Sequence, residues 1–429
     1  MTCIAFQIVP DIALTERLFD ELGAKTGDSS GITRDSYGMG EQFAHDLVRM
    51  EAEKIGMECH TDAACNLYMV MRGRGDGPAI MIGSHLDSVP SGGNFDGAAG
   101  VLAGLAVASG FHRAGQRPPV DLVVTAIRAE ESTWFGASYI GSRAAFGTLT
   151  DEELDGVCRS DTGIPLGAAI EQAGGDPNAL RRGDRALDPA RVALFVETHI
   201  EQGPVLIDER LPVGLVTGIR GSFRHRHAAC FGEYAHSGAT PRKTRRDAVR
   251  ATAELVSILD ELWARLETEG HDLSVTFGQV NTVAEEAAFS KVAGRVDFAL
   301  DIRSECDTTL DMMRAELRRV VAQIELRTGT NFDLGDETGS DPARMNKAIL
   351  AQMEQLADAL AIPARRMASG AGHDAAVFAR QGIPTAMLFI RNRNGSHNPD
   401  ESMDIDDFAQ AARLLCALCE SWSGPPEPD

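Results

Sequence analysis

Histidines and acidic residues follow hydrophobic, strand-like segments at four points of this sequence. They are His85 with Asp87 and Asp96, the pair Glu130 and Glu131, His199, and His397. Imidazole and carboxylate side chains together suit borderline divalent ions such as Zn²⁺ or Mn²⁺. Because open α/β sheets bind ligands at the carboxyl edge of their strands, we expect these residues to meet there. The HxD spacing also lets Asp87 orient the imidazole of His85.

Each residue has a simpler explanation when taken alone. Asp96 precedes a helical segment and suits an N-cap, the Glu130-Glu131 pair fits an exposed acidic loop, and a lone histidine is usually structural. Beside a cation, however, one of two adjacent carboxylates can bind the metal while the other carries a proton. The sequence has no GxSxG elbow, Walker loop or GxGxxG helix start, so serine-nucleophile and nucleotide-binding functions lack support.

The elements that position these residues alternate between short strands and longer helices, which indicates an α/β fold. Strands are expected at 66–72, 79–84, 121–127, 192–198 and 385–390, and helices at 97–109 and 346–360. Residues 150–191 are rich in Gly, Asp and Pro, so we expect connections there rather than core. Between 212 and 331 a helix at 246–268, strands near Ser274 and Arg295, and a helix at 308–328 favour a small α+β sandwich.

We therefore predict a mixed-sheet catalytic domain, formed by residues 1–211 and 332–429, with an inserted α+β domain at 212–331.

The composition of the chain argues against two classes of binding partner. The formal charge of −22 and the pI near 4.9 oppose binding to nucleic acid or to an anionic membrane surface. The N-terminal apolar run is broken by Pro10 and Asp11, and the eight scattered cysteines fit thiols in a reducing compartment, so we expect a soluble, cytoplasmic protein. Cys416 and Cys419 form a CxxC on an apolar helix face, which favours core packing over a zinc site.

Six motifs give this chain a specific resemblance to a known family. They are GSHLDSVPSGGNFDGAAGVLAGL, EESTWFGASYIGSRAAFG, ETHIEQGPVL, AHSGATPRKTRRDA, GAGHDAA and SHNPDES. In order and spacing they resemble the M20 metallopeptidase-like amidohydrolases, and within these the hydantoinase/carbamoylase group of N-carbamoyl-L-amino acid hydrolases and allantoate amidohydrolases. The segment DTGIPLGAAIEQAGGDP resembles one that carbamoylases carry, which favours ureido substrates.

The resemblance implies two divalent ions per subunit, either Zn²⁺, Mn²⁺ or Co²⁺. It implies that His85 and His199 bind one ion, that Glu131 and His397 bind the other, and that Asp96 bridges them. Glu130 would be the general base and Asp87 would orient His85. Two ions about 3.5–4 Å apart polarise a scissile carbonyl and acidify water, while an unligated carboxylate moves the proton.

The resemblance also implies a homodimer formed by the inserted domain. His236 of AHSG would stabilise the transition state, Arg303 would bind the substrate carboxylate through its planar fork, and Gln202 would contact the substrate. A turn could equally explain His236, and an ion pair with Asp301 or Glu305 could explain Arg303.

Three segments depart from the family pattern. Ser290 stands where carbamoylases usually have a substrate-binding Asn, Ser132-Thr133-Trp134 follows the glutamates, and RGSFRHRHAACFG carries His225 and His227. A hydroxyl lacks the paired donor and acceptor of an amide. These differences indicate an altered substrate pocket around intact metal ligands.

The sequence thus predicts a metal-dependent amidohydrolase that cleaves the C–N bond of an N-carbamoyl-L-amino acid or a related ureido or N-acyl compound. The alternatives are an aminoacylase or dipeptidase of the same superfamily and a non-catalytic dimeric binding protein. The binding-protein alternative predicts damaged ligands, whereas all five ligands and the base are present.

Overall fold

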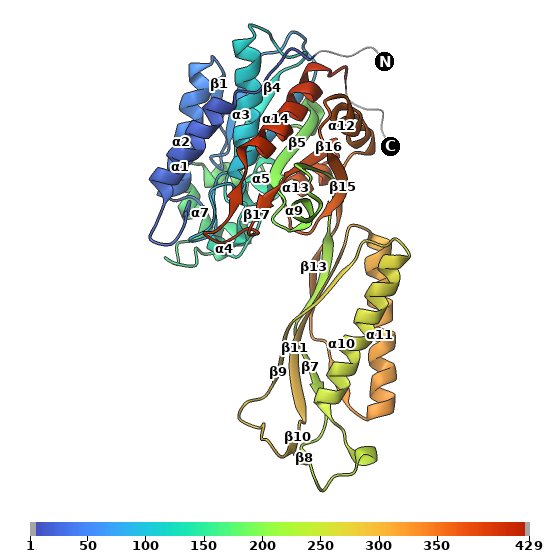
Figure 1. Cartoon of the computed structure of the whole chain (residues 1–429). Coiled ribbons are helices and arrows are strands. Elements are labelled where there is room, and N and C mark those ends of the chain that lie inside the picture. The colour runs from blue at the N-terminus through green and yellow to red at the C-terminus, as the bar shows by residue number, and fades with distance from the viewer. Residues whose placement is uncertain (1–5, 425–429) are drawn as a thin grey trace. The chain divides into compact units, whose positions relative to one another are not determined.

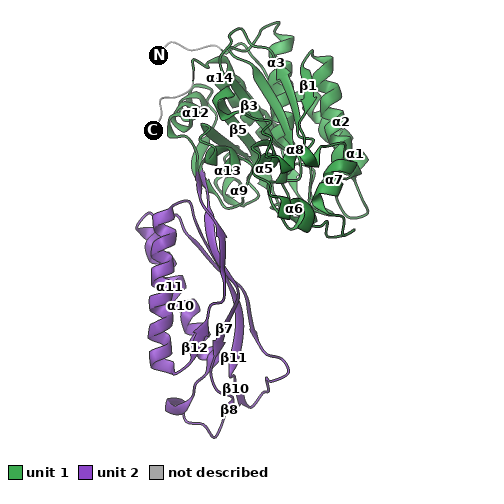
Figure 2. Cartoon of the chain, turned by 180° about the vertical axis from the view of Figure 1, so that it is seen from behind, with its two compact units in different colours: residues 1–217, 344–429 green, residues 218–343 purple. Residues whose placement is uncertain are grey.

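The computed structural model describes residues 6–424, which form two compact units. The first unit comprises residues 1–217 and 344–429, and the second comprises residues 218–343 (Figures 1 and 2). The second unit extends beyond the boundary expected near Asn331, because β12 (Asn331–Asp333), which begins at that residue, and β13 (Glu337–Ser340), which follows it, both pair with β7 (Gly221–Phe231). No helix among the described residues is long and apolar enough to cross a membrane.

The first unit is a mixed sheet covered by helices. Its strands run in the order β1-β2-β4-β3-β5-β16-β6-β14, with β15 beside β6. Their bounds are β1 (Glu58–Thr61), β2 (Leu67–Met71), β3 (Ala79–His85), β4 (Leu122–Ile127), β5 (Val192–Ile200), β6 (Val213–Ile219), β14 (Ala343–Arg344), β15 (Ala364–Ser369) and β16 (Thr385–Ile390). The central strands β4, β3, β5 and β16 are parallel, while β1, β2 and β6 are antiparallel to their neighbours. The predicted mixed α/β fold is confirmed.

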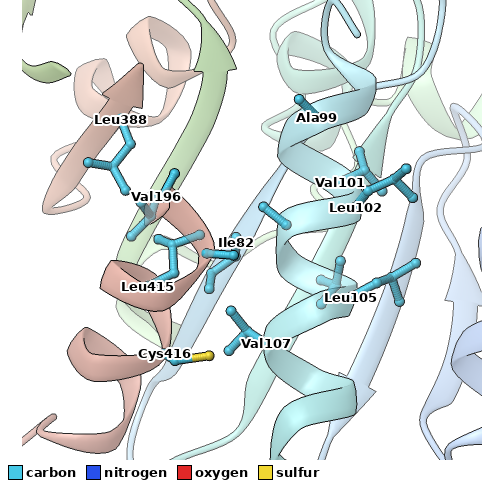
Figure 3. Close-up of a cluster of buried hydrophobic side chains, with 14 of the residues drawn as sticks. Ile82, Ala99, Val101, Leu102, Leu105, Val107, Val196, Leu388, Leu415 and Cys416 are labelled. Atoms are coloured by element: carbon cyan, nitrogen blue, oxygen red, sulfur yellow. The ribbon is translucent and has the colours of Figure 1, made fainter. Parts of the chain in front are cut away.

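The helices of this unit connect the strands and cover both faces. They are α1 (Ile12–Thr26), α2 (Met39–Lys54), α3 (Ala98–Arg113), α4 (Ser132–Phe135), α5 (Ile140–Ala145), α6 (Asp151–Gly156), α7 (Leu166–Gln172), α8 (Pro177–Arg181), α9 (Val205–Glu209), α12 (Lys347–Ala359), α13 (Ala375–Arg380) and α14 (Ile405–Glu420). Val196 of β5 packs in the cluster with α3 and α14 (Figure 3), whereas the preceding residue, Phe195, stacks on Phe378 of α13. Since strand side chains alternate between faces, α3 and α13 lie on opposite faces of the sheet.

Helix α3 is built from small and apolar residues because it is buried on every side. All residues from Ala98 to Phe111 are buried, and at Gly100 a Cβ atom would lie 2.2 Å from the backbone oxygen of Thr198. Only glycine allows this close approach to β5. Cys416 of α14 is buried in the same core (Figure 3). Cys419 is buried there too, as the place of both residues on an apolar helix face predicts.

The segment 150–191 is more ordered than its composition predicts. It contains the short helices α6, α7 and α8, and residues such as Leu154, Leu166 and Ile170 form a separate hydrophobic cluster with Trp134 and Ile140. The prediction of connections without core was therefore wrong here. Short helices with caps such as Thr150 and Asp176 pack a local core that the density of turn-forming residues conceals.

The second unit is an antiparallel sheet with two long helices on one face. The strand order is β12-β7-β11-β9, and β13 also pairs with β7. The bounds are β7 (Gly221–Phe231), β9 (Ser274–Thr282), β11 (Arg295–Ser304), β12 (Asn331–Asp333), β13 (Glu337–Ser340), α10 (Ala248–Thr268) and α11 (Asp307–Thr328). Phe298 and Ile302 of β11 pack against both helices, and the intervening residues face away from them. A two-residue ribbon pairs β8 (Ala235–His236) with β10 (Lys291–Val292).

Candidate metal centre

Five of the sequence-predicted residues meet at the carboxyl edge of the parallel strands. His85 ends β3, and His199 lies near the end of the neighbouring β5. Glu131 follows β4 directly before α4, Asp96 lies in the loop that leads into α3, and His397 follows β17 (Asn392–Arg393), a short strand paired with β18 (Ser402–Met403). Segments far apart in the chain converge here because parallel strands all end at the same edge.

Three buried side chains form the first cluster. Oδ1 of Asp96 lies 3.0 Å from Nε2 of His199 and 3.5 Å from Nε2 of His85, and the two Nε2 atoms are 3.5 Å apart. The Nδ1 atoms contact backbone carbonyls, of Asp87 at 3.0 Å and of Ile200 at 2.9 Å. A proton on each Nδ1 leaves each Nε2 as the ligand atom. The three side chains are therefore arranged to hold a cation.

The second cluster uses the other oxygen of Asp96. Nε2 of His397 lies 3.1 Å from Oε1 of Glu131 and 3.6 Å from Oδ2 of Asp96. His397 is half-exposed, whereas Glu131 and Asp96 are buried. One carboxylate thus presents one oxygen to each cluster, which is the arrangement of a bridging ligand. Asp96 is not an N-cap, because the cap residue of α3 is Gly97 and no side chain caps that helix.

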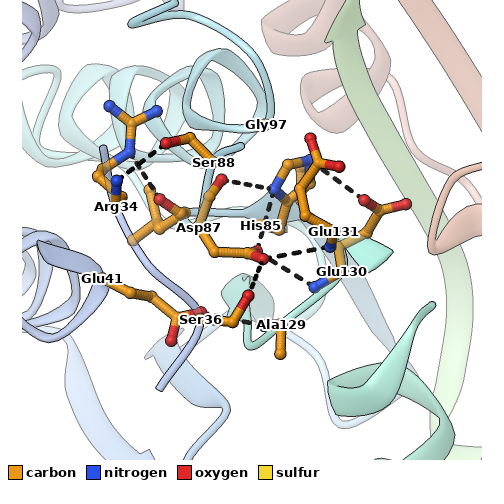
Figure 4. A network of polar contacts seen from close by, with 12 residues as sticks. Arg34, Ser36, Glu41, His85, Asp87, Ser88, Gly97, Ala129, Glu130 and Glu131 are labelled. Carbon is orange, nitrogen blue, oxygen red and sulfur yellow. Dashed lines mark hydrogen bonds and ion pairs between the residues drawn. The ribbon is translucent and has the colours of Figure 1, made fainter. Parts of the chain in front are cut away.

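Glu130 stands beside both clusters but belongs to neither. Its Oε2 lies 3.9 Å from Nε2 of His85. The Asp87 carboxylate accepts hydrogen bonds from the backbone N–H groups of Glu130 and Glu131, at 3.1 and 3.2 Å, and from the Ser36 hydroxyl at 2.6 Å (Figure 4). Asp87 also lies 3.3 Å from Nδ1 of His85, so its backbone carbonyl is the nearer partner of that ring. Asp87 therefore positions the two glutamates as well as the imidazole.

A second buried carboxylate, Glu41 of α2, braces the same loop. It accepts the backbone N–H of Ala129 at 3.0 Å and that of Tyr37 at 2.7 Å, and it forms an ion pair with Arg128 at 2.9 Å. Ala129 has a φ of 50°, a left-handed conformation that is unfavourable for a residue with a Cβ. The contacts of Glu41 offset that strain and hold Glu130 in place (Figure 4).

Further polar residues surround the clusters, and sequence reasoning did not identify them. Glu401 accepts the backbone N–H groups of Phe95 and Asp96, and Ser396 donates to both Asp96 and Glu401. Glu197 and Asp374 are fully buried; Glu197 accepts from Ser84 and from the Ala375 N–H, and Asp374 accepts from Ser142. Glu197, Asp374 and Glu401 lie within quoted motifs, so their acidic character at strand ends was a usable signal. Glu41 gave none, because it sits in an ordinary amphipathic helix.

The field of this cluster favours positive charge at the imidazoles. Although burial opposes a charge on His85, the Asp87 and Asp96 carboxylates raise its pKa well above the ordinary value. The Glu131 carboxylate raises the pKa of His397 to about 9. Burial raises the pKa of Glu130 well above its usual range, and Glu131 and Asp374 add to that effect while His85 opposes it. So many buried carboxylates require compensating positive charge, and the donor set of imidazoles and carboxylates fits divalent metal ions.

The remaining predicted residues are divided between the units. In the first unit, Gln202 has a φ of 63° and donates from Nε2 to Oδ2 of Asp96 at 2.8 Å, which places it at the metal-ligand cluster. In the second unit, Nδ1 of His236 accepts from the backbone N–H groups of Gly238 and Ala239, and the backbone oxygen of Ser290 accepts from Ser237. Arg303 donates to Asp301 through Nε and Nη2, at 3.1 and 2.8 Å.

Comparison with known proteins gives consistent matches along the chain. The model of a family described as peptidase family M20/M25/M40 matches residues 81–421. An N-carbamoyl-L-amino acid amidohydrolase of Geobacillus stearothermophilus is 36% identical over 400 residues, which cover 90% of this chain and 92% of that protein. An allantoate amidohydrolase of Bacillus subtilis is 29% identical over 390 residues, covering 90% and 92%.

A solved structure gives the same result at the level of the fold. A hydantoinase/carbamoylase family amidase from Burkholderia multivorans superposes with a TM-score of 0.86 at 28% identity, covering 96% of this chain and 98% of that one. The resemblance to this group, first indicated by the sequence motifs, is thereby confirmed.

Proposed function

We propose that this chain, which belongs to peptidase family M20/M25/M40, hydrolyses an N-carbamoyl-L-amino acid. Within that family it is an amidohydrolase of the hydantoinase/carbamoylase group, which acts on linear amide C–N bonds other than peptide bonds. The carbamoyl substrate is the activity named for the Geobacillus relative. The observation that carries the catalytic proposal is the position of Asp96, with one oxygen in each of two ligand clusters, beside a glutamate that belongs to neither.

We propose that two divalent ions, Zn²⁺, Mn²⁺ or Co²⁺, bind in this centre. His85 and His199 would hold one and Glu131 and His397 the other, with Asp96 shared by both. Ions in such a pair supply Lewis-acid polarisation of the scissile carbonyl, acidification of water and stabilisation of the oxyanion. The protein contributes the fixed Nδ1–H tautomers of His85 and His199, which the two backbone carbonyls impose and which leave Nε2 free to bind a metal.

Glu130 is the proposed general base. Its carboxylate would take the proton of the attacking water and deliver it to the leaving nitrogen. Burial favours this role, because it raises the pKa of Glu130 and so makes its carboxylate a better proton acceptor. Asp87 acts as a positioning residue, since it fixes the backbone of Glu130 and Glu131 and lies within reach of His85.

Substrate contacts are proposed for residues of both units. Gln202 is a polar contact beside Asp96, Arg303 binds the substrate carboxylate, His236 stabilises the transition state, and Ser290 occupies the position of the usual amide. The homodimer and the cytoplasmic location remain predictions. Light scattering coupled to size exclusion tests the dimer directly.

The decisive experiment is an ammonia-release assay of the chelator-treated protein reconstituted with Mn²⁺ or Zn²⁺. N-carbamoyl-L-amino acids, allantoate and ureidoglycolate form the substrate panel, and matched N-acetyl-L-amino acids report aminoacylase activity through free acetate. Glu130→Gln should keep its metal content and lose about a hundredfold to ten-thousandfold of kcat. Glu51→Gln is the matched control, because Glu51 is a buried carboxylate of α2 paired with Arg17 and Lys54.

Three outcomes contradict parts of the proposal. Full turnover by Glu130→Gln removes the general-base role. Acetate release without ammonia release identifies an aminoacylase. If turnover is unchanged by chelator treatment and by added metal, the reaction does not depend on a metal ion.

A further inference from the structure

The sheet of the second unit has one face that the helices leave uncovered. Phe298, Leu300 and Ile302 of β11 are buried with α10 and α11, so Asp301 and Arg303 point to the opposite face. Strand β7 lies beside β11 in this unit (Figure 2), and the register sets Arg224 opposite Asp301. Paired residues project to the same side, so Arg224 shares the open face with Arg303.

The pairing of the strands is irregular next to these residues. Phe298 pairs with Ala228 and Leu300 with His225, so Ala299 of β11 faces both Arg226 and His227 of β7. On its other side β11 passes from Gln279 to Phe277, which leaves Gly278 of β9 as an extra residue. Bulges re-aim side chains and often lie next to functional sites. The two bulges flank the same point of β11.

A cavity of about 390 Å³ opens at this point on the uncovered face. Arg224, Arg226, Arg303, Asp301 and Thr276 line it, together with Gly278, Ala299 and Leu300. We call it the arginine pocket, after Arg224, Arg226 and Arg303. Its polar lining is therefore made of cations, one carboxylate and one hydroxyl.

Asp301 is the one carboxylate among the residues that line the pocket, against three guanidinium groups. Oδ2 of Asp301 accepts from Arg303 and lies 3.3 Å from Nε of Arg224, while Oδ1 has no hydrogen-bond partner among the described residues. The side chain of Arg226 makes no hydrogen bond or ion pair with the residues that the structure describes. The lining thus carries three positive charges and one negative charge, a net charge of +2 in a chain of −22. A concave site of this kind attracts and orients an anion with two charges.

We propose that the arginine pocket binds a dicarboxylate and that the preferred substrates are N-carbamoyl derivatives of acidic amino acids. This inference rests on the proposed function, in which Arg303 binds the α-carboxylate. Arg224 and Arg226 then receive the side-chain carboxylate. They lie on one face about 6–7 Å apart along the strand, so they reach a second carboxylate only a few bonds from the first. RGSFRHRHAACFG, the segment that departs from the family pattern, supplies both arginines.

The test compares N-carbamoyl-L-glutamate with N-carbamoyl-L-glutamine, which has the same shape without the second charge. The reconstituted full-length protein should prefer the glutamate compound in kcat/KM by about tenfold to a hundredfold, the effect of one or two charge-assisted hydrogen bonds. Arg226→Gln and Arg224→Gln should each lower that preference by about tenfold. Arg295→Gln should leave it unchanged, because Arg295 lies on the same strand but pairs with Asp297 outside the pocket.

Failure of this inference is distinguishable from failure of the proposed function. Ammonia release that is equal for the two substrates, or higher for the glutamine compound, overturns the dicarboxylate pocket and leaves the amidohydrolase intact. Absence of ammonia from every ureido substrate overturns the proposed function instead. Calorimetric titration of the full-length protein with glutarate then tests the pocket alone. Binding weakened about tenfold by Arg226→Gln but not by Arg295→Gln supports it; no binding, or tighter binding of inorganic phosphate, overturns it.

Discussion

Replacing Glu41 by Gln is expected to loosen the loop that carries Glu130 and Glu131. Glu41 is fully buried and uses its two oxygens for the N–H groups of Tyr37 and Ala129 and for Arg128, whose side chain is 2% exposed. Glutamine keeps one acceptor oxygen and turns an amide N–H₂ toward one of these donors. It also leaves the Arg128 charge buried without its counter-ion, which costs about 3–5 kcal/mol.

The effect should be local and measurable by hydrogen exchange. A cost of about 3–5 kcal/mol at 1.36 kcal/mol per tenfold change speeds exchange of the loop amides by roughly a hundredfold to a few thousandfold. Mass spectrometry of peptides spanning residues 126–135 follows Ala129, Glu130 and Glu131 together. Ammonia release should fall with the loss of order, because Glu130 is displaced.

Two further variants make the reasoning refutable. Glu41→Gln combined with Arg128→Gln removes both charges, so it should exchange more slowly than Glu41→Gln alone. Glu58→Gln is the control, since the Glu58–Arg72 pair is exposed to solvent and contributes little to stability. If Glu41→Gln exchanges within threefold of the unaltered protein, or if the double variant is the worst of the set, the buried pair is not what holds the loop.

Three other outcomes are expected. Asp96→Asn replaces the carboxylate that gives one oxygen to each cluster with a neutral amide, so elemental analysis after dialysis should find fewer than one divalent ion per subunit, and two retained ions would rule out a bridging role. In denaturant unfolding, Gly97→Ala should lower the free energy of unfolding by more than 2 kcal/mol beyond the effect of Gly56→Ala, about the cost of a severe core clash. Both glycines have positive φ, but only at Gly97 would a Cβ lie 2.4 Å from the His85 ring. Equal costs for the two variants would contradict that contact. The Thr308 hydroxyl lowers the pKa of Cys306, whereas burial raises the pKa of Cys419 to about 12. At a pH of about 7, iodoacetamide should therefore label Cys306 and leave the Cys419 thiol unreacted. Labelling of Cys419 in the folded protein would refute this expectation.

The sequence predicted the central strands well because most of their residues are apolar. The expected strand at 385–390 coincides with β16, and those at 79–84 and 192–198 fall within β3 and β5. Parallel strands that are buried on both faces have such apolar runs. Ligand-binding residues in such sheets lie at the carboxyl ends of the strands. His85 and His199 could be placed for that reason.

What the sequence did not reveal is the polar packing around the centre. The partners of Glu41 lie 4 and about 87 residues away along the chain, and no periodicity connects them. The sequence also could not tell which oxygen of Asp87 contacts His85, because both the backbone carbonyl and the side-chain carboxylate of Asp87 lie near the imidazole ring. Such contacts depend on tertiary packing, which one sequence does not encode in any local pattern.

The contact between Gly100 and the backbone of Thr198 links helix packing to the spacing of two proposed metal ligands. Helix α3 begins just after Asp96, and β5 carries His199 just after Thr198, so the clearance left by a missing methyl group sets how closely carboxylate and imidazole approach. A bulkier side chain at residue 100 would push α3 away from β5 and increase the distance between Asp96 and His199. Substitution of Gly100 is therefore expected to change the spacing of Asp96 and His199 without altering any of the proposed ligands.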